Sequence, residues 1–569
     1  MDLLVRPIRR QETEDREKQA VRFGTLGLCL ALLMLAAARP AVAGDSLESR
    51  LPPGGFHDVV WQDPLPGKWQ TVDVTQKGIT PDAGDVTAKL QALLDGLTEP
   101  TILYFPPGAY RFGKITVRKG NVILKGAGPK QTVFQPPKDG TVLAWWGSGG
   151  KYDYARLGPE YQPRQVTADV PPGATVLPVA NTKGLQPGDM VLVEEDLEKW
   201  SYDDARRGRG GVFLVTKVEA DRITVDLPLA LGLDQVQRDK KNAIVAKLNP
   251  IRNVGLEGVR VVMPDERGEK ASSLFLKRVY NAYIRNVESF NPSRHHLEIC
   301  YSRQVVVEGC FFDEAKEKGG GGYGYGASVR DLSTLCKVEN NIFRDLRHAM
   351  ATEVGVNYCV FAYNLDVDRV RDLAHSPNAP PQCRDEKWIN SRKLNGITDA
   401  FITSEVVAHG NFPHQVLLEG NVFYIACVDR SHHTNGPHFF FRNCALGQPR
   451  KYGWWQEGAG IVVMGVNDDQ VVVGNFLRND SVILLQKHED PRTSQNTLIA
   501  GNVMKGQVDW GPLPAETKLP PSLYLKERPA FWPKDLAWPP FGPDAAGAAS
   551  AKIPAQLRYE REYKPDAKK

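Results

Sequence analysis

The clearest feature of the chain is a short pattern of apolar and polar positions that returns along its second half. Each copy begins with an apolar residue, passes through a Gly or Asn corner and ends on further apolar residues. The plain copies are "VEGCFF" (307–312), "VENNIF" (338–343), "FAYNLD" (361–366), "LEGNVF" (418–423), "FFRNCA" (440–445), "VVGNFL" (472–477) and "IAGNVM" (499–504). Degenerate copies, "LEGVRV" (256–261) and "IRNVES" (284–289), precede them.

Alternating Val, Ile and Phe, ended by Gly or Asn, predict short strands between turns. The copies return every 22 to 32 residues, with one interval of 57 that holds either two turns or one turn with a long loop. A unit of this length cannot bury its own apolar face, so it stacks on its neighbours. We therefore predict an all-β fold, a parallel β-helix, in which the corner Asn tolerates a left-handed bend and its amide bonds to the next copy.

The stretch before the repeats predicts a helix and then the first strands. Val86, Leu90, Leu93 and Leu94 share one side of that helix, which suits a plug over the end of the solenoid. Asp73, the Asp85-x-Thr87 helix start, "YFPPGAY" (104–110) and "LKGAG" (124–128) resemble the opening of the pectate lyase superfamily. That resemblance implies a right-handed parallel β-helix and a range of chemistries that includes hydrolases, lyases, epimerases and phage tailspikes.

The remaining stretches complete the predicted organisation. Residues 164–235 interrupt the repeat with hairpin-like strands and Pro-Gly turns, and we interpret them as a small inserted β domain. Proline excludes regular strands from the segment after Asn502, so we expect a strap along the helix surface and a disordered end near 545–569. The predicted parts are a signal peptide (1–43), an N-terminal cap with the first coils (44–163), the insertion (164–235), the β-helix (236–505) and the Pro-rich strap and tail (506–569).

Charge, the N-terminal segment and the cysteine count indicate the compartment of the protein and argue against nucleic acid as a partner. The net charge is +4 with acids and bases interspersed, so no basic stripe indicates nucleic acid binding. The uncharged run from Phe23 to Ala38 follows several arginines and precedes Ala41 and Ala43, as in a signal peptide. We expect an exported protein, secreted or periplasmic, with no stable membrane span after cleavage. Its seven mature cysteines are an odd number, so at least one thiol stays unpaired.

Histidines gather in the repeat region. Equivalent positions of successive coils lie roughly 4.8 Å apart, so residues at one offset from the corner Asn should share a face. Arg330, Glu353, His409 and the pair His432 and His433 precede that Asn at a similar distance, whereas Arg347, His348, Asp429 and Arg430 follow it. Solvent-facing strands of solenoids rarely carry such a set, and we interpret it as a functional groove. Phe439 and Phe441 are expected to fill the interior behind it.

The residue types favour a reaction on an acidic polysaccharide. A polysaccharide lyase or epimerase acting on a uronate needs Arg to neutralise the carboxylate and a base for the proton beside it. We predict catalytic residues Arg347, His348, His409, Asp429, His432 and His433, with His409 or His432 as the base, and substrate-binding residues Arg330, Glu353, His414, Asn435, Trp454 and Trp455. The stretch "DLRHAM" (345–350) resembles the Leu-Arg-His stretch of some alginate and chondroitin lyases, although their upstream lysine is matched here only by the closer Lys337.

Three alternatives stay open. An inverting glycoside hydrolase needs two separated carboxylates, for which Asp468 and Asp469 are the candidates. No cofactor is certain, but His409, His414, Asp429 and His433 could converge on zinc, and calcium could bind near Glu353. A solenoid that binds carbohydrate or mediates adhesion without catalysis would need aromatic and amide groups but no clustered titratable residues.

Overall fold

The computed structural model describes residues 46–147, 163–195, 208–233, 243–266, 271–316, 322–367, 406–410, 412–430, 432, 434–447, 458–487 and 493–564. The predicted signal peptide lies outside these residues. No helix in the described part of the chain combines the length and the apolar character needed to cross a membrane. The six cysteines that it includes are unpaired and buried.

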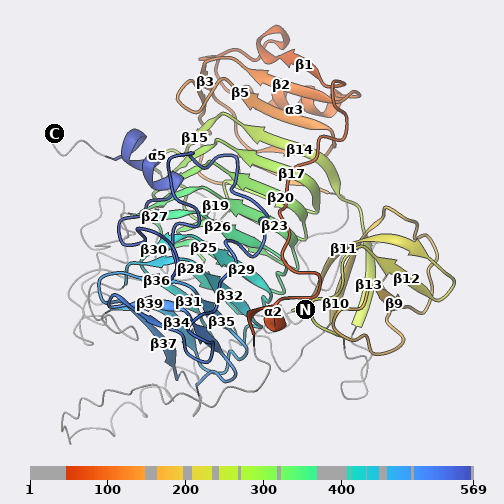
Figure 1. Ribbon diagram of the computed structural model, residues 1–569. Coiled ribbons are helices and arrows are strands. Elements are labelled where there is room, and N and C mark those ends of the chain that lie inside the picture. The colour runs from red at the N-terminus through yellow and green to blue at the C-terminus, as the bar shows by residue number, and fades with distance from the viewer. Residues whose placement is uncertain are drawn as a thin grey trace, which may run out of the picture. The chain divides into compact units, whose positions relative to one another are not determined.

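Three parallel sheets, here called A, B and C, wind around one apolar interior (Figure 1). Sheet A contains, in spatial order, β1 (Gln70–Asp73), β2 (Thr101–Phe105), β5 (Val122–Gly126), β14 (Ile251–Glu257), β17 (Val279–Arg285), β20 (Arg303–Glu308), β23 (Thr334–Glu339), β26 (Val360–Ala362), β29 (Val416–Glu419), β32 (His438–Phe441), β35 (Val471–Val473) and β38 (Leu498–Ala500).

Sheet B follows sheet A in each coil. It contains β3 (Gly108–Tyr110), β6 (Thr132–Phe134), β15 (Arg260–Val262), β18 (Glu288–Phe290), β21 (Phe311–Asp313), β24 (Ile342–Arg344), β27 (Leu365–Val367), β30 (Val422–Phe423), β33 (Cys444–Ala445), β36 (Phe476–Leu477), β39 (Asn502–Met504) and the antiparallel β40 (Gln507–Asp509).

Sheet C closes each coil before the chain returns to sheet A. It contains β4 (Ile115–Val117), β7 (Leu143–Trp146), β16 (Leu274–Lys277), β19 (His295–Cys300), β22 (Tyr325–Arg330), β25 (His348–Thr352), β28 (Val406–Ala408), β31 (Ala426–Val428), β34 (Ala459–Met464) and β37 (Val482–Gln486). Connections between parallel strands of one sheet are almost always right-handed. The expected right-handed parallel β-helix is therefore confirmed.

The repeated Asn positions form a ladder at the corner between sheets A and B. The Oδ1 atom of each Asn accepts the backbone N–H of the preceding copy, with N···O distances of 2.9 to 3.0 Å along Cys310, Asn341, Asn364, Asn421, Asn443, Asn475 and Asn502. The direct bond from Asn364 to Asn421 shows that the 57-residue interval is one coil. The corner Asn was predicted to take the left-handed bend. The bend falls instead on the residue before each Asn, for example Gly420 and Gly474.

The predicted N-terminal helix is α3 (Thr87–Gly96), which follows the 3-10 helix η1 (Val74–Lys77). The Asp85 carboxylate accepts the Thr87 backbone N–H at 2.8 Å, which satisfies one of the amides left open at a helix start. Leu90 and Leu94 are buried against the first coil, and Leu93 packs at the edge of the same cluster. The helix thus covers apolar interior at the end of the solenoid, as its pattern predicted.

Residues 164–248 interrupt the coils with a six-stranded antiparallel sheet. Its spatial order is β8 (Arg164–Gln165), β13 (Ala243–Leu248), β10 (Met190–Glu195), β11 (Arg209–Val218), β12 (Arg222–Val225) and β9 (Val176–Pro178). Because β13 pairs with both β8 and β10, this inserted sheet extends past the predicted boundary at residue 235. The first strand after it, β14, pairs with β5 and resumes the coil.

Both terminal segments cover the outside of sheets A and B. Arg50, the last residue of the short helix α2 (Leu47–Arg50), donates to the carbonyl oxygen of Asn496. Further along, Asp58 contacts Lys337 and Gln62 contacts Asn281. At the other end, Leu519, Tyr524, Trp532 and Phe541 of the segment interpreted as a strap pack on this outer face. The expected disorder is wrong for residues 545–564. They include helix α5 (Pro554–Glu562), which buries Ala555 and Tyr559 and hydrogen-bonds through Arg558 to the Asn340 carbonyl oxygen.

This cover explains a wrong prediction about the three phenylalanines. Phe440 points into the interior, whereas Phe439 and Phe441 pack outside with residues of the terminal segments. Phe56 lies edge-on to Phe439 with ring centroids 5.1 Å apart. Because both faces of sheet A are apolar at this strand, the sequence pattern alone could not decide which residues point inward.

Candidate active site

A row of aromatic and imidazole rings runs along the outer face of sheet C. His295, Tyr325 and His348 head three neighbouring strands and are paired in register. The rings of His295 and Tyr325 are stacked with centroids 4.6 Å apart, and Tyr325 meets His348 edge-on at 4.7 Å. The row continues through His409, 5.7 Å from His348, to His432, a further 4.6 Å away. Successive coils therefore bring residues far apart in sequence into one line.

A second row, of charged groups, lies where the same strands end. Arg330 is in register with Cys300, and the residues after Thr352, Ala408 and Val428 are likewise aligned. Those residues are Glu353, His409 and Asp429. We call the set His295, Glu298, Tyr325, Arg330, Arg347, His348, Glu353, His409, Asp429 and His432 the sheet C cluster.

Arg330 links two carboxylates in this cluster. Its Nη1 atom lies 3.3 Å from Glu298 Oε1, and its Nη2 atom lies 2.9 Å from Glu353 Oε2. Burial favours the neutral form of both acids, but contacts with His295 and Arg330 hold the pKa of Glu298 well below its usual range, and Arg330 and His409 lower that of Glu353. Both carboxylates are therefore ionised at neutral pH, and neither is poised to donate a proton.

His409 and Asp429 form the closest polar pair of the cluster. His409 Nδ1 lies 2.5 Å from Asp429 Oδ2, and each side chain is 11% exposed. Burial opposes protonation of the imidazole, but the charge and hydrogen bond of Asp429 outweigh it and raise the pKa of His409 above 6.5. This arrangement fixes the ring orientation and leaves Nε2 as the remaining polar atom.

His432 has the opposite electrostatic environment. Burial and then the neighbouring charge of His409 lower its pKa below 6.5. The two rings are perpendicular with centroids 4.6 Å apart. Two titratable groups whose surroundings move their pKa values apart are suited to act as acid and base in one reaction.

Arg347 adds a positive charge beside these histidines. It is half-buried, its backbone N–H donates to the carbonyl oxygen of Gly324, and its guanidinium lies 5.8 Å from the centroid of the Tyr325 ring. Its charge opposes protonation of His409. An anion that binds next to Arg347 would therefore also be attracted by protonated His409.

The structure brings together most of the predicted residues. Arg330, Arg347, His348, Glu353, His409, Asp429 and His432 all belong to the cluster, and His295, Glu298 and Tyr325 join them. The distance from the corner Asn had suggested that Asp429 aligns with His348. It aligns with His409 instead, because the connections from sheet B to sheet C differ in length. Counting from the start of each sheet C strand would have found His295 and Tyr325.

Two predicted substrate-binding residues are buried and bonded to turn backbone. His414 is buried, its Nδ1 atom lies 2.9 Å from the Phe412 carbonyl oxygen, and burial lowers its pKa to about 4. The buried Asn435 accepts the Gly410 N–H and donates to the Asp429 carbonyl oxygen, so its amide holds the turn. His433, Trp454 and Trp455 lie outside the described residues.

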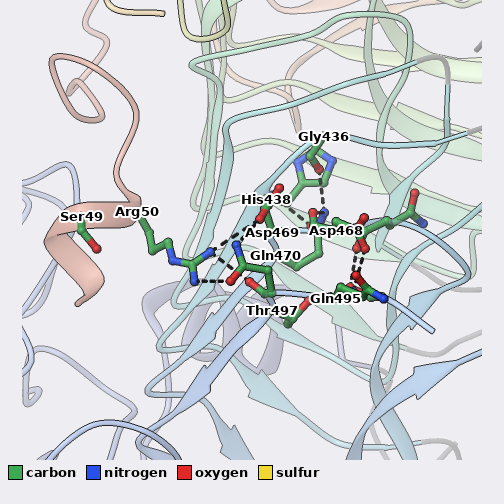
Figure 2. Close-up of polar contacts among 12 residues, drawn as sticks. Ser49, Arg50, Gly436, His438, Asp468, Asp469, Gln470, Gln495 and Thr497 are labelled. Carbon is green, nitrogen blue, oxygen red and sulfur yellow. Dashed lines mark hydrogen bonds and ion pairs between the residues drawn. The ribbon is translucent and has the colours of Figure 1, made fainter. Parts of the chain in front are cut away.

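The carboxylate pair considered for a hydrolase holds a turn. Figure 2 shows Asp468 and Asp469 beside the next coil, where Asp468 accepts the Gln495 N–H at 2.7 Å. Asp469 lies 2.5 Å from Asn496 Nδ2 and 3.8 Å from Arg50 Nη1. Lys337, the nearest counterpart of the lysine in the resembling lyases, lies on sheet A, where Asp58 and Glu339 flank it.

Within the described ranges, no three His, Cys, Asp or Glu side chains are grouped so that they could hold an ion. The proposed zinc set is divided, since His409 contacts Asp429 while His414 is buried against its own turn. Calcium near Glu353 stays a prediction.

Comparisons with known proteins find similarity in the fold of the backbone. No protein-family model matches the chain, and no curated protein matches its sequence. A tailspike of Pseudomonas phage phi297 is 13% identical, covering 80% of this chain and 74% of its own, with a TM-score of 0.49. The tailspike of Pseudomonas phage LKA1 is 12% identical, with coverages of 74% and 76% and a TM-score of 0.44. The catalytic unit of an α-1,3-glucanase from Streptomyces thermodiastaticus is 13% identical, with coverages of 79% and 61% and a TM-score of 0.41.

Proposed function

We propose that the protein is an exported polysaccharide lyase that cleaves a uronate-containing polymer by β-elimination at the sheet C cluster. The observation that carries the proposal is the pair of neighbouring histidines with opposite pKa changes, His409 and His432, beside Arg347. The leader-like N-terminus supports export.

In the proposed reaction, His432 is the base. It removes the proton from the carbon next to the substrate carboxylate, whose charge Arg347 stabilises as electrons move onto it. The electron pair of the broken C–H bond forms a C=C bond, and the neighbouring C–O bond to the next sugar breaks. His409, protonated through its contact with Asp429, gives the leaving oxygen its proton.

Arg330 has a supporting role in this scheme. Its contacts with Glu298 and Glu353 keep it between two carboxylates, so we assign the substrate carboxylate to Arg347 alone. A hydrolase would instead need a carboxylic acid with a raised pKa opposite a second carboxylate. The lowered pKa values of Glu298 and Glu353 therefore favour elimination over hydrolysis at this cluster.

The test is the chemical nature of the product. Purified protein is incubated with alginate, polygalacturonate, hyaluronan and chondroitin sulfate, and both the ultraviolet absorbance of unsaturated uronates and new reducing ends are followed. We expect the two signals to rise together on at least one polymer and to be lost in His432→Ala. New reducing ends without the absorbance would contradict the lyase assignment and indicate a hydrolase. Binding without either signal would indicate a carbohydrate-binding solenoid.

A matched variant separates loss of chemistry from loss of fold. His438 is a buried histidine on sheet A outside the cluster, and burial lowers its pKa to about 3. His438→Asn should retain activity at a temperature where it is folded. Equal loss of activity in both variants at such a temperature would remove the assigned role of His432.

A further inference from the structure

The inserted sheet lies on the outer face of the first strands of sheet C. Along these strands, alternate residues such as Leu143, Leu274 and Ile299 point into the solenoid interior. The residues between them point outward, and Ala144, Phe275 and Cys300 form one apolar cluster with Met190, Leu192, Val212 and Leu248 of the inserted sheet. The inserted sheet thus covers the outer face at β7 and β16 and at Cys300, the last residue of β19.

Polar contacts hold the same sheet against the region where the chain passes from sheet C into the first residues of the sheet A strands. Thr334 Oγ1 accepts the Val212 N–H at 2.9 Å, and Arg303 Nη1 donates to the Val212 carbonyl oxygen at 2.6 Å. One coil further, Asn357 Nδ2 donates to the Gly210 carbonyl oxygen at 2.6 Å. All three side chains are buried, so the inserted sheet is a fixed part of the fold.

The charged row begins directly beside this covered area. Arg330 is in register with Cys300, which the inserted sheet covers. Three further steps lead through Glu353 and His409 to Asp429, a length of about 14 Å at the usual spacing between paired strands. In the described part of the chain, the apolar contacts of the inserted sheet with outward-facing strand residues of sheet C end at Cys300.

We propose that the enzyme acts at chain ends. A polymer that follows the charged row cannot continue past Arg330 over Cys300 and β16, because inserted-sheet side chains already contact those positions. Sugar units can therefore extend from the cluster in one direction along the solenoid, and only a terminal stretch of the polymer reaches His409 and His432. The cleavage reaction in this inference rests on the proposed function. The restriction to chain ends rests on the position of the inserted sheet.

The experiment follows product size during cleavage. Wild-type protein is incubated with the same four uronate polymers, and the unsaturated product is measured alongside the average molar mass of the remaining polymer. End action predicts that small unsaturated products accumulate while the polymer mass falls slowly, in proportion to the units released. Early fragments of intermediate size with a steep fall in molar mass would overturn end action and leave the lyase chemistry intact.

Binding decides the question if a polymer is bound but not cleaved. Light scattering then counts protein molecules bound per chain for short and long fractions of that polymer. End binding predicts the same number per chain at every length. A number that grows in proportion to length would contradict the blocked face, and neither cleavage nor binding across the panel would contradict both the inference and the proposed function.

Discussion

The His409–Asp429 pair allows a sharp test through the substitution Asp429→Asn. The change keeps the shape of the side chain but removes the charge that faces His409 Nδ1 at 2.5 Å. Since the carboxylate raises the pKa of His409 against the effect of burial, its loss must lower that pKa. The acid of the proposed reaction would then be deprotonated at neutral pH.

The consequence is a change in the pH profile of kcat/KM. In the wild type, activity should rise with pH as His432 loses its proton below 6.5 and fall as His409 loses its proton above 6.5. Asp429→Asn should move the alkaline limb to lower pH. At neutral pH we expect kcat/KM to fall by about 10²- to 10⁴-fold, the usual contribution of a general acid or base, or about 3 to 5 kcal/mol of transition-state stabilisation.

The assay is the initial rate of unsaturated product formation between pH 5 and pH 9, a range on the order of the span over which histidines titrate. Asp313→Asn is the control, because Asp313 is a buried carboxylate that contacts Arg344 on sheet B. The Asp313→Asn protein should keep both the acidic and the alkaline limb of the kcat/KM profile at any temperature where it is folded. An alkaline limb that stays in place in Asp429→Asn would refute the assignment of His409 as the acid.

Four further predictions concern other contacts. Arg347→Ala should lower kcat/KM on the cleaved polymer by roughly 10- to 100-fold, the equivalent of one charged hydrogen bond, without changing the thermal midpoint. Burial raises the pKa of Glu419 from 4.5 to about 7, so the wild type should lose about 3 kcal/mol of unfolding free energy as pH rises through that window. Thermal scans of Glu419→Gln should show this dependence removed. Asn421→Ala removes the acceptor of the Asn364 N–H and should cost about 1 to 3 kcal/mol in denaturant unfolding. Arg442→Ala removes contacts to Asp544 and to strap carbonyl oxygens, and limited proteolysis should then cut the strap faster.

Much of the fold could be predicted because one position repeats. The corner side chain makes the same bonds in successive coils, and that constraint leaves a visible period in the sequence. The Asn421 side chain, for example, accepts the Asn364 N–H and donates to the Phe361 carbonyl oxygen and to Asn443 Oδ1. The chain thereby reveals which stretches lie next to one another. Arg330, Glu353 and His409 were aligned correctly on this basis.

The remaining differences have physical causes that lie outside the repeat. Asp429 was grouped with His348 and not with His409 because the connection before each sheet C strand varies in length. Phe439 and Phe441 were assigned to the interior because the sequence does not show that a distant segment containing Phe56 covers sheet A. Glu298 was missed since a lone acid in an apolar strand carries no pattern, and only Arg330 on the next coil explains it.

The central claim is that the sheet C cluster holds the reacting uronate. The most direct measurement is a crystal structure of His432→Ala with a bound oligosaccharide of the polymer that the wild type cleaves. We predict a uronate whose carboxylate contacts Arg347 and whose glycosidic oxygen lies within hydrogen-bonding distance of His409. An oligosaccharide bound with full occupancy on another face, with the sheet C cluster empty, would contradict the account.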